Sequence, residues 1–367
     1  MSVYVFLGPS LPVERAREVL DAHYLPPVSC GDVTELVLDR EPPTVIGIVD
    51  GLFEQVPAVW HKEILFAMSR GVRVVGASSM GALRAAELHA FGMDGVGSVF
   101  EDFRDGRLTD DDEVTIVHAP GEDGYRPLSE AMVNLRAGLA GALRAGAIGA
   151  ATHDTLLAAA KRTFYPDRSW GQVYVDGRKA GLPQAELDAL RDHVRSTRPD
   201  AKRDDALALL ARIRDLVAEG VQPPVCEFDF EPTYYWEKLL RTVRQQRGER
   251  AMEQALGVPA AAALARLAEQ QPEVASAALL DTLVRREAEH LGVLVPDEIR
   301  ARHAEEGGAL REVVSGHLRG DLSGPVLREL ERRGLLDAAR AGLAAGPDAP
   351  ESGGPQPAVP LPSGRRE

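Results

Sequence analysis

The segment Gly76–Leu88 holds the residue types and spacing most typical of nucleophilic chemistry in this sequence. It follows a predicted buried strand and opens a helix, and Ser79 lies in a small-x-Ser-x-Gly frame that ends at Gly81. This frame resembles a nucleophile elbow, where small flanking residues allow a tight strand-to-helix turn. We expect the N–H groups of Met80 and Gly81 to point toward an oxyanion formed at the serine. The alternative is that Ser78 or Ser79 simply N-caps the helix.

A serine nucleophile needs a base, and none of the nine His residues stands in a recognisable triad frame. Lys62 is the other candidate, because desolvation lowers the pKa of a buried lysine and frees its amine to accept a proton. The alternative is a solvated surface lysine. Asp50 ends a predicted strand, where the ligands of parallel sheets gather, and it either orients Lys62 or caps a turn with Gly51.

Two other segments resemble ligand-binding motifs, but neither predicts a bound metal or cofactor. The run Asp110-Asp111-Asp112-Glu113 resembles a divalent-metal cluster, yet adjacent carboxylates point different ways and no EF-hand loop surrounds them. We expect a solvated loop or helix start there and predict no metal. The glycine-rich segment 92–97 lacks both the dinucleotide fingerprint and a Walker lysine, so a nucleotide role is not favoured.

The elements that position these residues alternate between strand and helix over residues 1–127. Apolar runs typical of buried parallel strands are separated by helical segments, and Ser10 is predicted to N-cap a helix that begins at Leu11. The alternation predicts an α/β fold whose N-terminal layer is a doubly wound, mostly parallel sheet. The predicted strands are Val3–Leu7, Thr44–Val49, Val72–Val75 and Glu113–His118, and the helices include Lys62–Ser69, Gly81–Ala90 and a face formed by Val96, Val99, Phe100 and Phe103.

Residues 128–345 have a different pattern and predict a mostly α-helical region. Ala- and Leu-rich segments with helical periodicity are separated by Pro and Gly, and residues 346–367 are Pro/Gly-rich and predicted to be disordered. The predicted helices are Leu128–Ala145, Gln184–Ser196, Asp204–Glu219, Pro232–Gln246, Ala260–Glu269, Glu273–Leu291 and Pro296–Glu306. Lys238, Arg241, Arg244 and Arg247 recur every three residues and form either a partner-binding stripe or a solvated helix face.

Composition excludes several classes of protein. A formal net charge of −14 argues against general nucleic-acid binding, which needs a basic face to neutralise phosphates. Two cysteines cannot build a disulfide framework or a thiolate zinc site. No apolar run is long enough to span a membrane, so we expect a soluble, cytoplasmic protein.

Several ordered blocks of the sequence strongly resemble the TfuA family. They are Ile48–Gly51, Pro57–Leu65, Gly76–Leu88, Phe91–Gly97, Arg104–Val114 and Val133–Arg136, so the resemblance covers roughly residues 1–150. Because the blocks are long and occur in order, they are much more specific than the serine frame alone. No family motif is recognised beyond about residue 170.

The resemblance implies a role beside YcaO enzymes, which activate a peptide amide with ATP so that sulfur replaces its oxygen. TfuA proteins are implicated in hydrolysing a thiocarboxylated ThiS-like carrier, which releases sulfide near the YcaO, and a Ser–Lys pair is ascribed to the family. Ser79 and Lys62 are the matching positions here, as nucleophile and base. Asp50, Ser78, Met80 and Gly81 would support the reaction without a cofactor, and Arg84 either steadies the anionic substrate or pairs with Glu87.

A different class of function is a non-catalytic adaptor that docks the YcaO enzyme, the carrier and, indirectly, the precursor peptide. The large predicted helical surface and the arginine stripe suit this role. A nucleotide-binding module at the sheet edge is a third option, against which the missing phosphate-loop motif argues.

Overall fold

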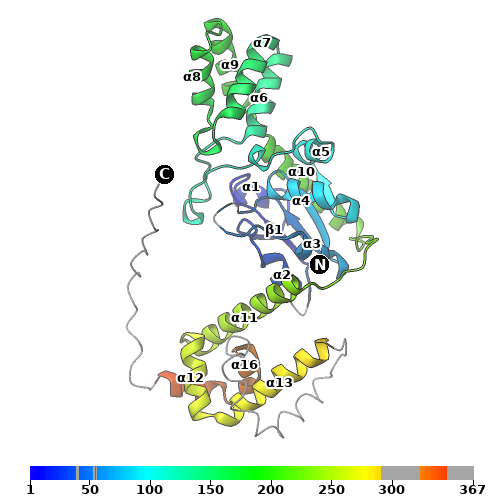
Figure 1. Ribbon diagram of the computed structural model, residues 1–367, viewed down its shortest axis with the longest axis vertical. Coiled ribbons are helices and arrows are strands. Elements are labelled where there is room, and N and C mark those ends of the chain that lie inside the picture. Colours follow the sequence, from blue (N-terminus) through cyan, green and yellow to red (C-terminus); the bar gives the residue numbers. More distant parts are fainter. Residues whose placement is uncertain (39–40, 53, 55, 291–322, 345–367) are drawn as a thin grey trace, which may run out of the picture. The chain divides into compact units, whose positions relative to one another are not determined.

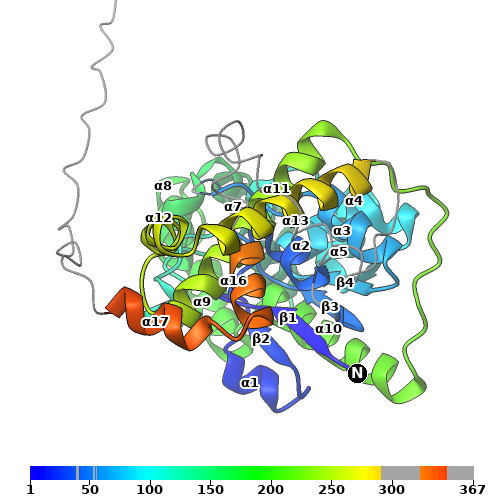
Figure 2. The same ribbon diagram turned by 90° about the horizontal axis from the view of Figure 1, so that it is seen from below.

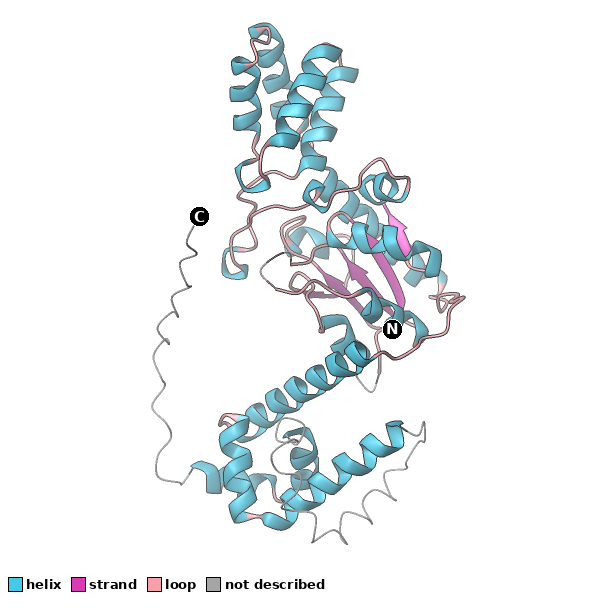
Figure 3. Cartoon of the chain, viewed as in Figure 1, coloured by secondary structure: helices cyan, strands magenta, loops and turns pink. Residues whose placement is uncertain are grey.

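The computed structural model describes residues 1–38, 41–52, 54, 56–290 and 323–344. The chain divides into two compact units, Met1–Leu240 and Arg241–Glu367 (Figure 1). The described strands all lie in the first unit (Figure 3). Predicted helix Pro296–Glu306 and the tail at 346–367 fall outside the described residues.

One five-stranded parallel sheet forms the centre of the first unit. Its strand order is β2-β1-β3-β4-β5, and every neighbouring pair is parallel. The strands are β1 (Val3–Phe6), β2 (His23–Leu25), β3 (Val45–Ile48), β4 (Arg73–Ala77) and β5 (Asp94–Val96). In this order the chain reverses its winding direction between β1 and β3, and the carboxyl ends of strands at such a point are where ligands of open α/β sheets bind.

Alternate strand residues supply two separate cores, one on each face of the sheet. Phe6, Ile46, Ile48 and Val74 face one core, and Val5, Val45, Val75 and Ala77 face the other. The first core is covered by α2 (Asp32–Val37), α3 (His61–Ser69), α4 (Met80–Leu88) and α5 (Ser98–Arg104), and the second by α1 (Val13–Arg17) and α10 (Ala201–Glu219). The strands are apolar on both faces because helices cover both.

Helix α10 completes the second face although more than 100 residues separate it from β5. Ala206, Leu209 and Ile213 lie on its sheet-facing side and are fully buried. Gly47 of β3 allows the close approach, because a Cβ there would lie 2.9 Å from Ile213 Cδ1. The beginning of α10 is thereby fixed beside the sheet.

The segment between α5 and α10 forms a helical group with its own core. Figure 1 shows α6 (Met132–Arg144), α7 (Ala150–Arg162), α8 (Trp170–Lys179) and α9 (Gln184–Thr197) running together. Leu135, Leu139, Leu156, Leu187 and Leu190 are buried between them. Helix α6 also contacts α10, so this group is attached to the helix that covers the sheet.

The second unit is helical in its described part. It contains the end of α11 (Tyr234–Leu256), then α12 (Ala260–Gln270), α13 (Pro272–His290), α16 (Ser323–Arg332) and α17 (Leu336–Ala344). Helices α13 and α16 lie side by side, as Figure 2 shows, around a core that includes Met252, Leu267 and Leu330. None of the described helices of either unit is long and apolar enough to cross a lipid bilayer.

The predicted fold class is confirmed: a parallel, doubly wound sheet is followed by a mostly helical region. The predicted strand Glu113–His118 is wrong. The chain there forms the short 3₁₀ helix η2 (Asp111–Glu113) and then an irregular segment with an isolated bridge between His118 and Pro127. Its apolar residues, such as Val114, are buried under helices rather than paired in the sheet.

Two short edge strands and the first helix also differ from the sequence prediction. Strands β2 and β5, each with three residues, were not predicted because neither has an apolar run, and Val96 of β5 was wrongly assigned to a helix face. Helix α1 has Pro12 rather than Ser10 at its N-cap, because Ser10 is engaged elsewhere. The predicted domain boundary at residue 127 stays a prediction, and residues 128–240 belong to the same compact unit as the sheet.

Candidate active site

The turn from β4 into α4 holds a serine in a strained backbone conformation. Ser78 has a φ of 70°, and the Ser79 N–H donates to the Ala77 carbonyl at 2.9 Å, which closes a γ-turn around Ser78. A γ-turn with positive φ is rare and strained for a residue with a side chain. Such strain persists only where the surroundings enforce it, and it concentrates at functional sites.

Two glycines let α4 begin directly against the sheet. A Cβ at Gly81 would lie 1.7 Å from the Ile48 carbonyl oxygen, and one at Gly76 would lie 2.2 Å from the Gly81 carbonyl oxygen. No larger residue fits either position without moving backbone. These contacts hold the serine turn at the carboxyl edge of the sheet, beside the end of β3, as a nucleophile elbow requires.

A chain of buried hydroxyls leads from this turn to the end of β3. The Ser78 hydroxyl donates to Ser10 Oγ at 3.0 Å, and the Ser10 hydroxyl donates to Asp50 Oδ1 at 2.6 Å. The second carboxylate oxygen of Asp50 accepts from the backbone N–H groups of Gly8 and Ser10. Asp50 is 1% exposed and Ser78 is fully buried. Segments that follow β1, β3 and β4 therefore meet in one polar network at the point where the sheet reverses its winding.

Lys202, the second residue of α10, approaches the Asp50 end of this network. Its Nζ lies 4.0 Å from Asp50 Oδ1, the oxygen that also accepts from Ser10, and donates to the Val114 carbonyl at 2.9 Å. The Lys202 side chain is 4% exposed. A lysine this deeply buried is rare unless it is closely paired, and here its nearest carboxylate oxygen is beyond hydrogen-bond distance.

Burial governs the acid–base state of Lys202 and of its neighbour Glu130. Desolvation lowers the pKa of Lys202, against the opposing effect of the carboxylates of Asp50, Asp200 and Glu130. Burial likewise raises the pKa of Glu130, and the nearby Asp200 charge adds to the rise. Both groups are shifted toward their neutral forms, as expected where the charged form is desolvated.

The beginning of α10 is held in place by side chains. Asp200 caps the helix by accepting from the Arg203 N–H, and the side-chain Oδ1 of Asn134 accepts from the Lys202 N–H at 3.1 Å. Asn134 also donates to both Glu130 and Asp200. This anchoring fixes where the Lys202 side chain begins.

The sequence prediction missed Lys202, and it considered Ser10 only as a helix cap. One signal was present: Lys202 stands in line with Ala206, Leu209 and Ile213, at i, i+4, i+7 and i+11, on the apolar stripe of α10. A lysine on the buried stripe of a helix is unexpected, and it indicates that polar groups lie next to it inside the protein. Ser10 was recognisable only once β1 and β3 were known to be neighbours.

The predicted nucleophile and oxyanion groups lie at the same turn. Ser79 is the N-terminal flanking residue of α4, is 3% exposed, and caps no N–H with its side chain. The Gly81 N–H already donates to the Val49 carbonyl at 3.3 Å. Met80 is the first residue of α4. Of the two predicted oxyanion donors, the Met80 N–H therefore has no backbone carbonyl acceptor among the described residues, whereas the Gly81 N–H has one.

Lys62, the predicted base, occupies a different environment. Its Nζ lies 5.0 Å from the centre of the Phe230 ring, which itself contacts Phe66 in a tilted arrangement and Trp236 edge to face. This contact suits a positively charged ammonium. No hydrogen bond among the described residues joins Lys62 to Ser78 or Ser79.

Arg84 forms the ion pair with Glu87 that the i, i+3 spacing allows. Its Nη1 lies 2.7 Å from Glu87 Oε2, and its Nε donates to the Val59 carbonyl at 2.9 Å. His61 shares the same Glu87 oxygen. Arg84 thus ties α4 to the segment before α3.

Three carboxylates of the acidic run 110–113 pair with cations from the helical group. Lys161 lies 3.0 Å from Asp110 Oδ2 and 2.9 Å from Glu113 Oε1, and it also pairs with Asp112. Arg136 binds Glu113 through two hydrogen bonds of 2.8 Å. Three carboxylates of this run lie close enough together to bind a metal ion, namely those of Asp110, Asp112 and Glu113. However, they already form ion pairs with three basic side chains, Arg136, Lys161 and Arg168.

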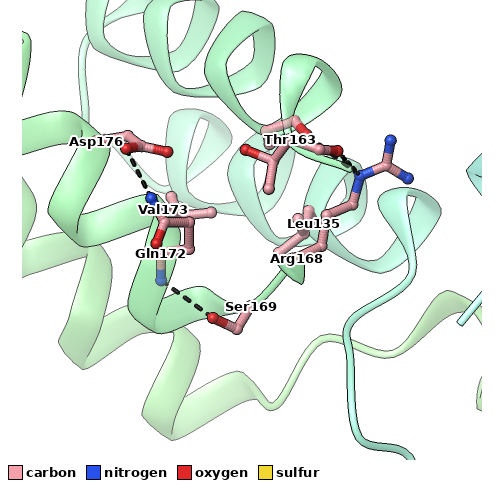
Figure 4. A pocket seen from close by; sticks show the side chains of 8 residues that line it. Leu135, Thr163, Arg168, Ser169, Gln172, Val173 and Asp176 are labelled. Carbon is pink, nitrogen blue, oxygen red and sulfur yellow. Dashed lines mark hydrogen bonds between the residues drawn. The ribbon is translucent and has the colours of Figure 1, made fainter. Parts of the chain in front are cut away.

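Two further features lie away from the serine turn. A small surface pocket is lined by Leu135, Ala160, Thr163, Arg168, Ser169, Gln172, Val173 and Asp176, and Figure 4 shows Arg168 hydrogen bonded to Thr163 and Gln172 hydrogen bonded to Asp176. Of the predicted partner-binding stripe, Lys238, Arg241 and Arg244 are exposed and Arg247 is half-buried on α11. Partner binding by this stripe stays a prediction.

Residues 50–169 match the family model described as TfuA-like protein. The chain therefore contains a TfuA-like domain, and the resemblance predicted from the sequence blocks is confirmed over this range. No curated protein matches the chain. The matched range includes Asp50, Lys62, Ser78 and Ser79 but ends 33 positions before Lys202.

Proposed function

We propose that this chain, which contains a TfuA-like domain, hydrolyses the thiocarboxylate of a ThiS-like carrier protein and thereby supplies sulfide to a YcaO enzyme. The TfuA family is linked to YcaO thioamidation, which gives the class of reaction. The observation that carries the proposal is the strained serine turn at the carboxyl edge of the sheet, with its buried hydroxyl chain to Asp50. This arrangement has the parts of a serine acyl-transfer site.

The proposed reaction has two stages. A serine of the Ser78–Ser79 pair attacks the thiocarboxylate carbon, an O–C bond forms, and the C–S bond breaks as hydrosulfide leaves with the serine proton. Water then attacks the acyl-serine, which returns the carrier carboxylate, a proton and the free hydroxyl. The Met80 N–H is the backbone donor best placed to steady the oxyanion. The sequence-based assignment makes Ser79 the nucleophile and Lys62 the base.

Access to the serines requires a local opening. Ser78 is fully buried and Ser79 nearly so, so the end of a carrier reaches the turn only when covering residues move. Pro27 and Tyr125 pack against Gly8, whose N–H donates to Asp50, and we propose that they move in this opening. A closed site of this kind excludes water, which strengthens electrostatic stabilisation once substrate is bound.

The direct test is sulfide release from a ThiS-like carrier bearing a carboxy-terminal thiocarboxylate. Wild type is expected to release sulfide and carrier carboxylate in equal amounts, and the double variant Ser78→Ala/Ser79→Ala to be slower by at least about 10³-fold. Circular dichroism and thermal unfolding confirm that the variant folds. Release at the wild-type rate by the folded double variant rejects the proposal.

An adaptor role is the second candidate, favoured by the surface of α11 and the segment before it. Tyr234 and Tyr235 are 74% and 68% exposed beside the basic stripe, and aromatic residues and arginine are enriched at protein interfaces. An adaptor would still increase the binding of precursor peptide to a YcaO enzyme when both serines are alanine. A pull-down with the double variant separates this role from hydrolysis.

A further inference from the structure

We infer that Ser78 is the nucleophile and that Lys202 is the final acceptor of its proton, which passes through Ser10 and Asp50. This inference deepens the proposed function and rests on it only for the identity of the substrate. It assigns a role to a residue of α10 that lies outside the range matched by the TfuA-like family model.

Ser78, rather than Ser79, occupies the geometry of an activated nucleophile. An activated serine hydroxyl donates to its base, and that base is oriented by a third group. The Ser78 hydroxyl donates to Ser10, and Ser10 donates to Asp50, whereas the Ser79 side chain does not cap the helix it precedes. The positive φ of 70° is at Ser78, where the turn projects the side chain out of the regular path of strand and helix.

The direction of the hydrogen bonds defines the direction of proton flow. As Ser78 attacks, its proton moves to Ser10 Oγ while the Ser10 proton moves to Asp50 Oδ1. Lys202 Nζ faces this same oxygen at 4.0 Å, so a small approach lets a neutral amine take the proton and leaves an ammonium–carboxylate pair. When the C–S bond breaks, the same path returns the proton to the leaving sulfur.

The surroundings of Lys202 allow both of its protonation states. As a neutral amine it still donates to the Val114 carbonyl and keeps a lone pair for the incoming proton. As an ammonium it faces the carboxylates of Asp50 at the end of β3, Asp200 at the start of α10 and Glu130 before α6. Burial lowers its pKa below the ordinary 10.5, so the neutral form is populated at lower pH than for an exposed lysine.

A serine-directed fluorophosphonate tests this without any carrier protein. The Ser78 oxygen displaces fluoride from phosphorus and gives up its proton, so the labelling rate reports the proton acceptor directly. The rate is measured against pH for wild type, Lys202→Met, Lys202→Arg and Ser10→Ala. Lys161→Met is the matched control, because it removes a helical lysine that pairs with carboxylates outside the serine network.

We expect the wild-type rate to rise with pH along a limb that ends below pH 10.5, as Lys202 loses its proton. Lys202→Met and Lys202→Arg should slow labelling by about 10²-fold or more and abolish this limb, because neither side chain exchanges a proton in this range. Arginine keeps the positive charge, so loss of the limb in Lys202→Arg separates proton transfer from simple charge pairing. Lys161→Met should keep the limb.

Ser10→Ala gives an independent outcome if the Lys202 variants do not fold, because it interrupts the path and leaves the Lys202–Asp50 pair in place. Wild-type rate and pH profile in either Ser10→Ala or a folded Lys202 variant overturns the inference. It is also overturned if Lys62→Met alone removes the limb, or if wild-type Ser78 is not labelled. If labelling depends on Lys202 but no sulfide is released from a thiocarboxylated carrier, the proposed function is rejected and the inference is retained. If sulfide is released but labelling does not depend on Lys202, only the inference is rejected.

Discussion

Two clusters in the first unit each place a helical lysine opposite carboxylates, and they differ in how completely its charge is paired. Lys161 lies within 3.0 Å of oxygens of Asp110 and Glu113, and hydrogen bonds with Asp112, Glu113 and Asp110 outweigh burial and raise its pKa. Lys202 is more deeply buried and approaches Asp50 only to 4.0 Å, and burial lowers its pKa.

The difference shows how one residue type is used for structure in one place and for chemistry in another. A lysine saturated with close carboxylates stays charged and joins α7 to the segment before α6. A lysine that is buried but incompletely paired has an accessible neutral form, which a proton acceptor needs. Asp110 of the acidic run is exposed to solvent, whereas Asp50 is buried among Ser10, Gly8 and Lys202.

The largest expected effect is the loss of sulfide release in Ser78→Ala. Removing a serine nucleophile typically costs about 10⁴–10⁶ in kcat, because the covalent route is lost. Ser79→Ala should change kcat by less than about tenfold, since a hydroxyl that makes no cap contributes little to the helix. Steady-state kinetics with a thiocarboxylated carrier measure both, and the reverse order of effects would assign the attack to Ser79.

A smaller effect is expected when the path to Asp50 is interrupted. Ser10→Ala removes the hydroxyl that joins Ser78 to Asp50, and loss of general-base assistance typically lowers kcat by about 10²–10⁴-fold. KM should change little, because Ser10 is buried and its hydroxyl contacts Ser78 and Asp50. The exposed Ser196→Ala serves as the matched control. A change confined to KM would mean that Ser10 shapes the substrate site instead.

The acidic cluster should respond in stability rather than in rate. Arg168 is 2% exposed and pairs with Asp112, so Arg168→Met leaves that carboxylate with one cation fewer. Asp112 is partly exposed and keeps Lys161 as a partner, so losing the Arg168 hydrogen bonds should cost about 1–3 kcal/mol in the free energy of unfolding, measurable by urea denaturation. The kcat of the folded fraction should stay within about tenfold of wild type. A loss of kcat comparable to that of Ser10→Ala would remove the distinction between the two clusters.

The smallest expected effect is on stability, from the side chain of α10 that caps the N-terminus of α5. Asp205 accepts from the N–H groups of Ser98 and Val99, and a cap of this kind is worth about 0.5–2 kcal/mol. Asp205→Ala should therefore lower the free energy of unfolding by about that amount. Asp204→Ala, on the exposed side of the same helix, is the matched control. Equal effects of the two substitutions would argue against the capping role.

Sequence reasoning identified the sheet and the serine turn because their signals are local. Apolar runs that end in Gly or Asp mark the buried strands β1, β3 and β4, and small residues around Ser79 mark the tight turn into α4. The short edge strands were missed, and the segment after Glu113 was predicted as a strand because burial under helices and burial in a sheet give the same apolar run.

The partners of the serine were not predictable in the same way, because tertiary packing brings them together. Ser10 and Ser78 are 68 positions apart, and Lys202 lies further along the chain than any motif the sequence comparison matched. Lys62 was chosen for its position in a recognised block, but its amine lies against Phe230. The sequence periodicity does place Lys202 on the apolar stripe of its helix. It does not reveal that Asp50 is the carboxylate next to it, because that depends on how the helix packs on the sheet.

Tandem mass spectrometry of the labelled, proteolysed protein locates the fluorophosphonate adduct and so identifies the nucleophile. Electron-transfer fragmentation between the two adjacent serines distinguishes one from the other. We predict a single adduct on Ser78 in wild type and its disappearance in Ser78→Ala. An adduct on Ser79, or an unchanged adduct in folded Ser78→Ala, would contradict it.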